Sequence, residues 1–206
     1  MAPKISIIIP HKRTVMNNRS LEINLSMLQA GTHHDYELIV DTECPKDPYK
    51  IWNEASAKAR GEFLVFSNSD VLMAPGWDMP MVDNCEYNNI VTGYLVEPGN
   101  IGVAAVNIQR DFGRRPDDFW RVNFEEWAVK FAATIEGAWI HRNGESWYMP
   151  CMIRRDWFMD TNGFDTTLGF PNPNDILFWN ECEQQRGTTF KRVGSIAYHF
   201  QNLSGR

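Results

Sequence analysis

The stretch GEFLVFSNSDV, from Gly61 to Val71, constrains the fold of this chain more than any other. Phe63 to Phe66 is a short aromatic and β-branched run, typical of a buried strand, and small polar residues follow it as far as Asp70. In an open α/β sheet, ligands bind in the crevice beyond the carboxyl ends of the strands. A carboxylate there can bind a hard cation, which can in turn hold a diphosphate. A plain turn is the alternative, because Asn, Ser and Asp are common turn residues.

The first seventy residues alternate between strand and helix patterns. Ile5 to Ile9 and Tyr36 to Val40 are apolar runs, as expected for buried strands of a parallel sheet. Leucines recur at helical spacing between these runs, and Gly31 stands where a C-terminal helix cap belongs. Asp47 and Pro48 predict the start of a second helix, with Asp47 as its N-cap. Strand, helix, strand, helix, strand is the pattern of a doubly wound α/β sheet with a parallel centre.

The chain after Asp70 alternates less regularly. Strands are expected over Ile90–Val96, Ile101–Ile108, Trp147–Ile153 and Val193–Phe200. Helices are expected over Asp78–Cys85, over Arg154–Asp160 and from Asn172-Pro173 onward. The last of these helices carries Asn174 and Asp175 in its first turn. The polar stretch Asp111–Asp118 is expected to be a loop that could close over a site.

A further helix, with an aromatic stripe on one face, is expected after this loop. The stripe consists of Trp120, Phe124, Trp127 and Phe131. Aromatic residues at this spacing predict a helix face packed on the core. A stacking platform for an acceptor sugar is the alternative interpretation.

Composition and charge exclude several classes of protein. The chain has 206 residues, 43% of them hydrophobic, and no repeat, so we expect a single domain over residues 1–206. Its formal net charge of −6 argues against a nucleic-acid partner bound on a broad basic face. The apolar run Ile5–Ile9 is too short for a membrane span or a signal peptide. The four cysteines include no Cys-x-x-Cys pair, which favours a reducing, cytoplasmic location and argues against a structural zinc site.

Short motifs in a set order carry the strongest functional signal. In order they are SIIIP, ELIVD, Asn53-x-x-x-Ala57, GEFLVFSNSD, NGFD from Asn162 to Asp165, Asn174-Asp175 and the strand residue His199. Together they resemble the nucleotide-sugar glycosyltransferases of the GT-A fold, and within them the large inverting family 2. The resemblance implies a GT-A type α/β fold, with a Rossmann-like, mostly parallel central sheet flanked by helices. It also implies a nucleotide-binding half over about residues 1–73 and a smaller acceptor-side half over about 74–206.

The resemblance implies roles for particular residues. Asp70 matches the last acid of the family's metal-binding Asp-x-Asp motif, and His199 matches a histidine that often completes the metal site. Asp175 matches the acid that serves as the catalytic base. Asp41 sits where an acid commonly contacts the nucleotide base. The residues expected to contact the donor are Pro10, His11, Asp41, Asn53, Asn68, Ser69 and Asp70.

The implied reaction needs these residue types. A leaving nucleoside diphosphate builds up negative charge, which Mn²⁺ or Mg²⁺ neutralises, and an imidazole ligand favours Mn²⁺. The acceptor hydroxyl must lose its proton as the new bond forms, and a positioned carboxylate such as Asp175 can take it. The resemblance therefore implies a metal-dependent glycosyltransferase of the hexosyltransferase type. Its donor would be a nucleotide-diphosphate sugar, first of all a UDP-sugar, and its acceptor a glycan or another hydroxyl compound.

The sequence departs from the family pattern in three places. Asn68 and Asn174 stand where acids are usual, and the expected Asp-Asp-Gly-Ser motif is absent after the second strand. A sugar-nucleotide-binding module that has lost catalysis is therefore one alternative. Each site residue also has a simpler interpretation of its own: Asp175 could interact only with the helix dipole, and His199 could be an ordinary strand histidine.

The segment after the first strand leaves a second alternative open. His11, Lys12 and Arg13 could bind an anionic ligand there, or could form a solvated basic loop. A nucleotidyltransferase also binds a nucleotide at this position, usually with a glycine-rich loop that holds the triphosphate. The segment PHKRTVMNN contains no glycine, which disfavours that class.

Overall fold

A computed structural model of the chain describes residues 2–42, 47–99, 107–140, 150–167, 169 and 174–200. The strands are β1 (Ile5–Pro10), β2 (Tyr36–Asp41), β3 (Phe63–Phe66), β4 (Val71–Met73), β5 (Asn89–Glu97), β6 (Asn107–Gln109), β7 (Ala138–Ile140), β8 (Cys151–Arg154) and β9 (Thr189–His199). The helices are α1 (Val15–Gly31), α2 (Pro48–Lys58), α3 (Asp78–Val82), α4 (Arg121–Ala132), α5 (Arg155–Met159) and α6 (Asn174–Arg186), with a short 3-10 helix over Pro116–Asp118.

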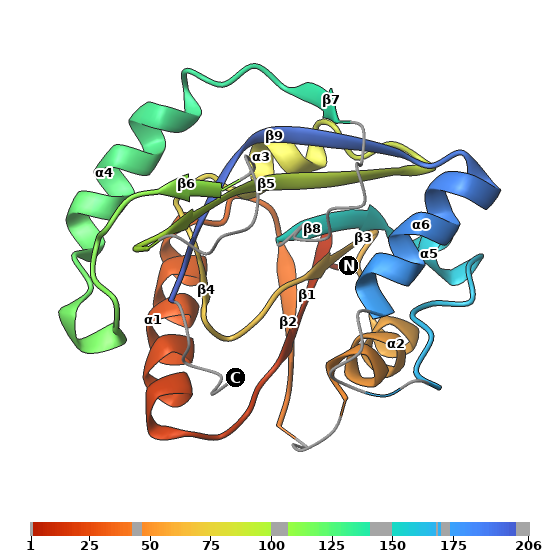
Figure 1. Ribbon diagram of the computed structural model, residues 1–206, viewed down its shortest axis with the longest axis horizontal. Helices are drawn as coiled ribbons and strands as arrows, with labels where there is room; N and C mark the ends of the chain where they lie inside the picture. Colours follow the sequence, from red (N-terminus) through yellow and green to blue (C-terminus); the bar gives the residue numbers. More distant parts are fainter. Residues whose placement is uncertain are drawn as a thin grey trace.

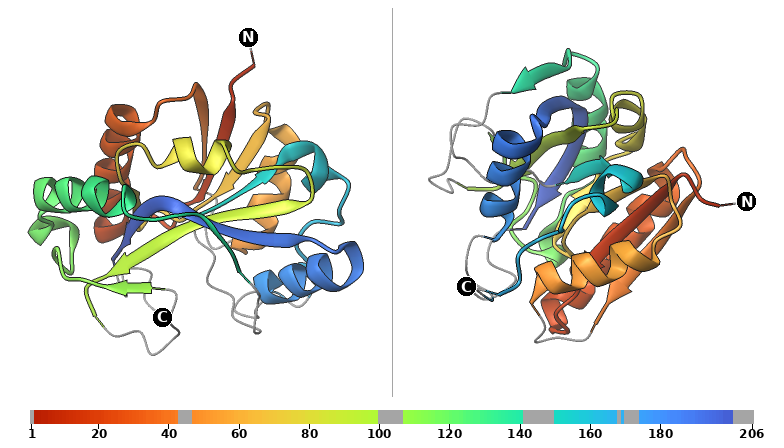
Figure 2. Two further views of the ribbon diagram at one scale, coloured as in Figure 1. Left: turned by 90° about the horizontal axis from the view of Figure 1, so that it is seen from above. Right: turned by 90° about the vertical axis from the view of Figure 1, so that its right-hand side faces the viewer.

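One sheet with helices on both faces organises the molecule (Figure 1). Its strand order is β2-β1-β3-β8-β5-β9-β4, while β6 pairs with β5 and β7 with β9. One face of β1 and β3 packs on residues of α2, α5 and α6, and the other face packs on residues of α1 and α3 (Figure 2). The predicted α/β class is therefore confirmed.

The N-terminal part of the sheet is parallel, as expected. β1 pairs in parallel with both β2 and β3, so the carboxyl ends of the three strands lie at one edge. The remainder is mixed: β8 is antiparallel to β3 and β5, β5 and β9 are parallel, and β4 is antiparallel to β9. This mixed half brings the end of β9 back to the start of β4, next to Asp70.

Several predicted boundaries can be compared with the structure. Asp47 caps α2, because its side chain accepts a hydrogen bond from Tyr49 N at 2.9 Å. The strand expected over Ile101–Ile108 is described only from residue 107, where β6 begins. Likewise, residues 147–149 of the strand expected over Trp147–Ile153 and residues 172–173 before α6 lie outside the described residues.

Gly31 has a different role from the predicted cap. It is the last residue of α1, and the cap is Thr32, whose N–H donates to Leu28 O at 3.0 Å. A Cβ on Gly31 would lie 2.8 Å from Pro75 Cα, which is closer than side chains tolerate. The Gly31 carbonyl also accepts a 2.7 Å hydrogen bond from Gly76 N. The glycine therefore allows α1 to approach the segment after β4 closely.

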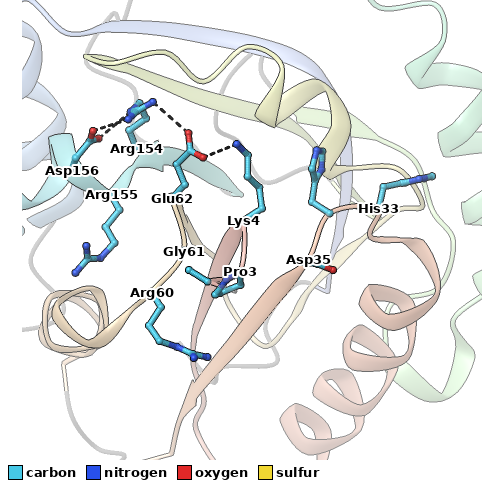
Figure 3. Close-up of a pocket in the computed structure, with 12 residues that line it drawn as sticks. Pro3, Lys4, His33, Asp35, Arg60, Gly61, Glu62, Arg154, Arg155 and Asp156 are labelled. Carbon is cyan, nitrogen blue, oxygen red and sulfur yellow. Dashed lines mark hydrogen bonds and ion pairs between the residues drawn. The ribbon is translucent and has the colours of Figure 1, made fainter.

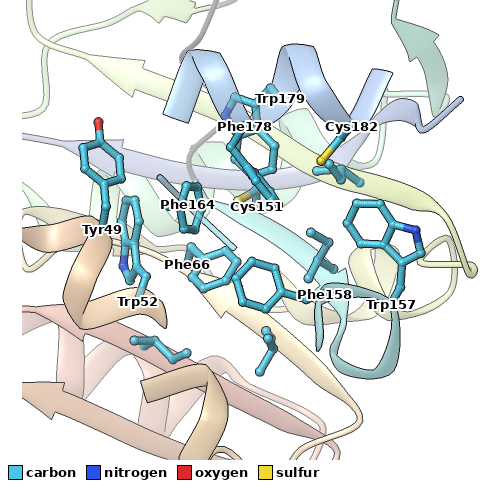
Figure 4. Close-up of a cluster of buried hydrophobic side chains, with 14 of the residues drawn as sticks. Tyr49, Trp52, Phe66, Cys151, Trp157, Phe158, Phe164, Phe178, Trp179 and Cys182 are labelled. Carbon is cyan, nitrogen blue, oxygen red and sulfur yellow. The ribbon is translucent and has the colours of Figure 1, made fainter. Parts of the chain in front are cut away.

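An aromatic cluster joins α2, β3, α5 and α6, with Phe164 at its centre (Figure 4). The Phe164 ring contacts the rings of Tyr49, Trp52, Phe66, Phe158, Phe178 and Trp179, with centroids 4.6–5.9 Å apart. Truncating a buried phenylalanine typically costs about 3–5 kcal/mol of stability. This packing fixes the start of α6 relative to the end of β3.

The aromatic stripe of α4 is core at its centre, as predicted, and exposed at its start. Phe124 is fully buried, and Trp127 and Phe131 stack on each other with centroids 4.9 Å apart. Trp120, which precedes the helix, remains 62% exposed. None of the helices among the described residues is long and apolar enough to cross a membrane.

Candidate functional site

The carboxyl ends of β1, β2 and β3 form the edge at which the sequence predicts a ligand site. Pro10 and Asp41 pair across β1 and β2, and His11 N donates to Asp41 O at 2.8 Å. Asn68, Ser69 and Asp70 lie in the turn between β3 and β4. The structure therefore brings six of the seven predicted donor-contact residues to one edge, and Asn53 is the exception.

Buried polar atoms at this edge lack protein partners. Among the described residues, His11 Nδ1 and Ser67 Oγ are buried and accept or donate no hydrogen bond. The other ring nitrogen of His11 lies 2.8 Å from Asn18 Oδ1. Leaving a buried polar group unsatisfied costs about 1–3 kcal/mol, so such groups usually meet water or a ligand. The edge is therefore built to receive polar atoms from outside the chain.

Asp70 and His199 meet because β4 and β9 pair. Val71 lies opposite His199 in this antiparallel ladder, and Phe200 N donates to Asp70 O at 3.1 Å. His199 Nε2 lies 3.7 Å from Asp70 Oδ2. Both side chains thus reach the same point at the sheet edge, although they lie far apart in the sequence.

Glu97, at the end of β5, holds the other side of the His199 ring. His199 Nδ1 lies 2.5 Å from Glu97 Oε1, and Glu97 is only 2% exposed. Burial lowers the pKa of His199, but hydrogen bonds and charge interactions with Asp70 and Glu97 outweigh this effect and raise the pKa to about 9. Without another cation, the imidazole is therefore protonated between two carboxylates at neutral pH.

These residues fit a metal ion that is shared with a ligand, but they do not form a complete protein cage. Among the described residues, no group of three or more His, Cys, Asp or Glu side chains is arranged to hold a metal. Asp70 and His199 offer one carboxylate and one imidazole, and Mg²⁺ sites commonly combine one or two carboxylates with substrate phosphates. A metal-binding histidine usually donates its second N–H to a carboxylate, as His199 can to Glu97.

Asp175 lies in the first turn of α6, where the Tyr49 hydroxyl donates to its Oδ1 at 3.0 Å. Burial and the Asp175 charge raise the pKa of Tyr49, which keeps this hydroxyl protonated as a donor. Burial also raises the pKa of the Cys151 thiol, and the Asp175 charge raises it further. Cys151 pairs with Phe66, the last residue of β3. Through Tyr49, Asp175 is connected to the aromatic cluster that includes Phe66, the last residue of β3.

Asn174, the neighbour of Asp175, is completely buried. Neither polar atom of its amide has a hydrogen-bond partner among the described residues. An acid at this position, as the family pattern has it, would be a buried charge. The asparagine avoids the desolvation cost of that charge.

Asn53 and Asp165 serve the turn that carries Phe164. The Asn53 amide donates to Phe164 O at 2.8 Å and accepts from Phe164 N at 2.9 Å. The Asn53 amide therefore holds the backbone of the turn that carries Phe164, and the structure does not bring Asn53 to the edge formed by the carboxyl ends of β1, β2 and β3. Asp165 accepts a hydrogen bond from Thr167 N at 2.8 Å, and this contact lowers its pKa.

A pocket of about 710 Å³ lies at the opposite edge of the sheet, at the amino ends of β1 and β3 (Figure 3). Several of its charged side chains neutralise one another. Lys4 and Arg154 both contact Glu62, at 2.6 and 3.4 Å, and Arg154 also contacts Asp156 at 2.6 Å. These ion pairs are partly exposed. Arg155 Nε, which also belongs to the pocket lining, is buried without a hydrogen-bond partner among the described residues.

Sequence reasoning missed two residues that contact predicted site residues: Glu97, which contacts His199, and Tyr49, which contacts Asp175. Glu97 carries a weak signal, since it is a lone acid at the end of the apolar run IVTGYLVE. Tyr49 carries none, because a tyrosine in the first turn of a helix is ordinary. Both become visible only through contacts between distant elements.

Comparisons with known proteins found similar structures but no similar sequences. No family model matches the sequence, and no curated protein does so. Among solved structures, the chain is similar to GalNAc-T7 with UDP, GalNAc and Mn²⁺, with a TM-score of 0.62 and 11% identity over 96% of this chain and 43% of that one. It is also similar to S. aureus TarS 1–349 with UDP, with a TM-score of 0.61 and 14% identity over 95% of this chain and 60% of that one.

A second structure of S. aureus TarS 1–349 has a TM-score of 0.60 and 14% identity over 97% of this chain and 61% of that one. These neighbours are GT-A glycosyltransferases. The likeness shows that this chain has the GT-A fold. The chain spans about half the length of the structures that it matches.

Proposed function

Starting from a GT-A fold with Asp70 and His199 at its carboxyl edge, we propose that this chain is a glycosyltransferase. It moves a sugar from a nucleoside-diphosphate sugar, first of all a UDP-sugar, to an acceptor hydroxyl. The observation that carries the proposal is the meeting of Asp70 and His199, 3.7 Å apart, at the carboxyl edge of the sheet. The UDP named with GalNAc-T7 and with TarS supports the donor class.

The donor binds along the ends of the three parallel strands. Asp41 contacts the nucleotide base, and Pro10 forms the adjacent wall. The unpartnered His11 Nδ1 and Ser67 Oγ gain hydrogen bonds to polar atoms of the donor or of water. Asn68 and Ser69 border the diphosphate through the same turn as Asp70.

Asp70 and His199 would hold a divalent cation together with the diphosphate of the donor. Mn²⁺ or Mg²⁺ bound there would neutralise the negative charge of the departing nucleoside diphosphate. The imidazole of His199 favours Mn²⁺, since nitrogen ligands suit transition metals better than Mg²⁺. The Mn²⁺ named with GalNAc-T7 supports this choice.

Asp175 acts as the general base. The acceptor oxygen attacks the anomeric carbon of the donor, and Asp175 takes the hydroxyl proton as the new bond forms. The bond between that carbon and the phosphate oxygen breaks, and its electron pair leaves with the nucleoside diphosphate. Attack from the face opposite the leaving group inverts the configuration. The Tyr49 hydroxyl holds the Asp175 carboxylate in one orientation.

The alternative is a module that binds sugar nucleotides without turning them over, and Asn68 and Asn174 are the observations that favour it. Two measurements on one sample separate the functions. A thermal-shift panel of nucleoside diphosphates and nucleotide sugars identifies the ligand, because a ligand at a hundredfold excess over Kd adds roughly 3 kcal/mol of stability. Release of UDP from the best-binding UDP-sugar, alone or with a glycan library, then reports turnover.

Binding together with UDP release supports the transferase. Binding without any release across the library supports the decayed module. If no nucleotide stabilises the chain, with or without Mn²⁺, both proposals are wrong.

A further inference from the structure

Glu97 makes the shortest contact to His199 and has no role in the mechanism above. We infer that Glu97 is a positioning residue, which orients the His199 ring and holds the imidazole proton on Nδ1 so that Nε2 is presented to the metal. The inference rests on the proposed function, since it concerns the same metal site. It adds a residue that the motifs of the sequence do not indicate.

The position of Glu97 follows from the pairing of β5 with β9. Val96 lies opposite Tyr198 in this parallel ladder, so the next residue of each strand, Glu97 and His199, also lie side by side. Glu97 is 2% exposed, and a buried carboxylate is costly unless it is paired. Its Oε1 lies 2.5 Å from His199 Nδ1, which provides such a partner.

The two carboxylates contact different nitrogens of the ring. Asp70 Oδ2 is nearest to Nε2, at 3.7 Å, whereas Glu97 Oε1 is bonded to Nδ1. The nitrogens of an imidazole point away from each other, so the bonded oxygen of Glu97 and Asp70 face different sides of the ring. Glu97 therefore acts through His199 and does not itself bind the metal on the Asp70 side.

This arrangement selects one tautomer. In a neutral imidazole, one nitrogen donates and the other accepts, and the partner of one nitrogen decides which. A carboxylate can only accept, so Glu97 requires the proton on Nδ1 and leaves the Nε2 lone pair for a cation beside Asp70. Such a carboxylate also makes the imidazole a stronger ligand. A glutamine at this position would keep the shape but lose the charge.

The test measures Mn²⁺ binding in the presence of UDP, by the loss of the free-Mn²⁺ signal in electron paramagnetic resonance. Glu97→Gln should weaken Mn²⁺ binding by about 10- to 100-fold, the usual effect of losing such a partner. Mg²⁺ binding, followed by competition with Mn²⁺, should weaken less, because Mg²⁺ relies less on the imidazole. The preference for Mn²⁺ over Mg²⁺ therefore shrinks, which a purely structural role of Glu97 would not cause.

A double-mutant cycle shows whether Glu97 acts through His199. In a His199→Ala background, Glu97→Gln should change Mn²⁺ binding less than about twofold, because the residue through which it acts is gone. Glu37→Gln is the matched control, since Glu37 pairs with Ser6 and Arg60 away from this edge, and it should leave Mn²⁺ binding unchanged. Glu97→Asp retains the carboxylate at a shorter reach and should lie between the parent and Glu97→Gln. It also serves as the test variant if Glu97→Gln does not fold.

The outcomes separate the inference from the proposed function. If the parent binds Mn²⁺ with UDP but Glu97→Gln and Glu97→Asp bind it equally well, the role of Glu97 is wrong and the metal site stands. An equal loss in the parent and His199→Ala backgrounds would show that Glu97 acts independently of His199, which also overturns the inference. A parent that binds UDP without Mn²⁺ overturns the metal site and, with it, this role of Glu97.

Discussion

The two edges of the sheet both carry charged side chains but differ in how these side chains are paired and buried. At the amino edge, Lys4, Glu62 and Arg154 neutralise one another in contact with solvent. At the carboxyl edge, Asp70 and Glu97 are buried around a single histidine, near unpartnered atoms of His11 and Ser67. Exposed ion pairs are typically worth about 0–1 kcal/mol, whereas buried charges are costly unless they are paired or bind a metal ion. The edges therefore differ in how their charges are placed: the carboxyl edge gathers buried carboxylates around one histidine, whereas the amino edge holds partly exposed ion pairs.

The largest effect is expected for Asp175→Asn at the carboxyl edge. This change keeps the shape of the side chain and removes its capacity to take the acceptor proton. Loss of a general base typically lowers the rate by a factor of about 10² to 10⁴. Transfer should fall accordingly, as measured by UDP release with the acceptor found by screening, while the Kd for the donor stays nearly constant.

Asp165→Asn is the matched control for this change. Asp165 is exposed in the turn after Phe164, and among the described residues its side chain forms a hydrogen bond only with Thr167. It should transfer sugar at close to the parent rate. If Asp175→Asn also did so and Asp165→Asn did not, the base would be Asp165.

A smaller effect is expected for Asp70→Ala. The change removes the carboxylate ligand from a turn outside the apolar clusters, so the fold should remain intact. UDP binding with Mn²⁺ should weaken by at least about tenfold, and His199→Ala should act in the same direction but less strongly. Calorimetric Kd values for UDP measure both. If Asp70→Ala bound UDP with Mn²⁺ as tightly as the parent, Asp70 would have only a structural role in the turn.

The smallest effect is expected for Glu62→Gln, the counterpart at the amino edge. It breaks the contacts with Lys4 and Arg154, which are partly exposed. The free energy of unfolding should fall by less than about 1 kcal/mol, as for other exposed ion pairs, and the UDP affinity should not change. Urea denaturation and calorimetry test the two statements. If Glu62→Gln lost as much UDP affinity as Asp70→Ala, UDP binding would not be specific to the carboxyl edge, which would contradict this comparison.

Local patterns predict one part of this molecule well. The apolar runs Ile5–Ile9 and Phe63–Phe66 predict β1 and β3, and Asp47 predicts the start of α2. These predictions succeed because the pattern of a strand or of a helix cap is contained within a few consecutive residues. Asp70 and His199 could be named as partners only through the family resemblance. Nothing in either segment alone shows that β4 and β9 pair.

Other features depend on contacts between distant segments, which single-residue patterns do not encode. Glu97 meets His199 through the pairing of β5 with β9, whose contacting residues lie about a hundred positions apart. Asn53 resembles a donor-binding residue in sequence, yet its amide holds the backbone of Phe164. Gly31 resembles a helix cap, yet it is a glycine because Pro75 approaches it. For Asn53 and Gly31, contacts with distant segments account for the residue in a way that the local sequence pattern does not predict.

Calorimetric titration of the unmodified chain with UDP, once in Mn²⁺ and once in EDTA, tests the central claim most directly. That claim is that Asp70 and His199 complete a metal site only together with a diphosphate. The account predicts that Mn²⁺ strengthens UDP binding by at least about 1.4 kcal/mol, which is tenfold in Kd. The same Kd in Mn²⁺ and in EDTA would contradict it.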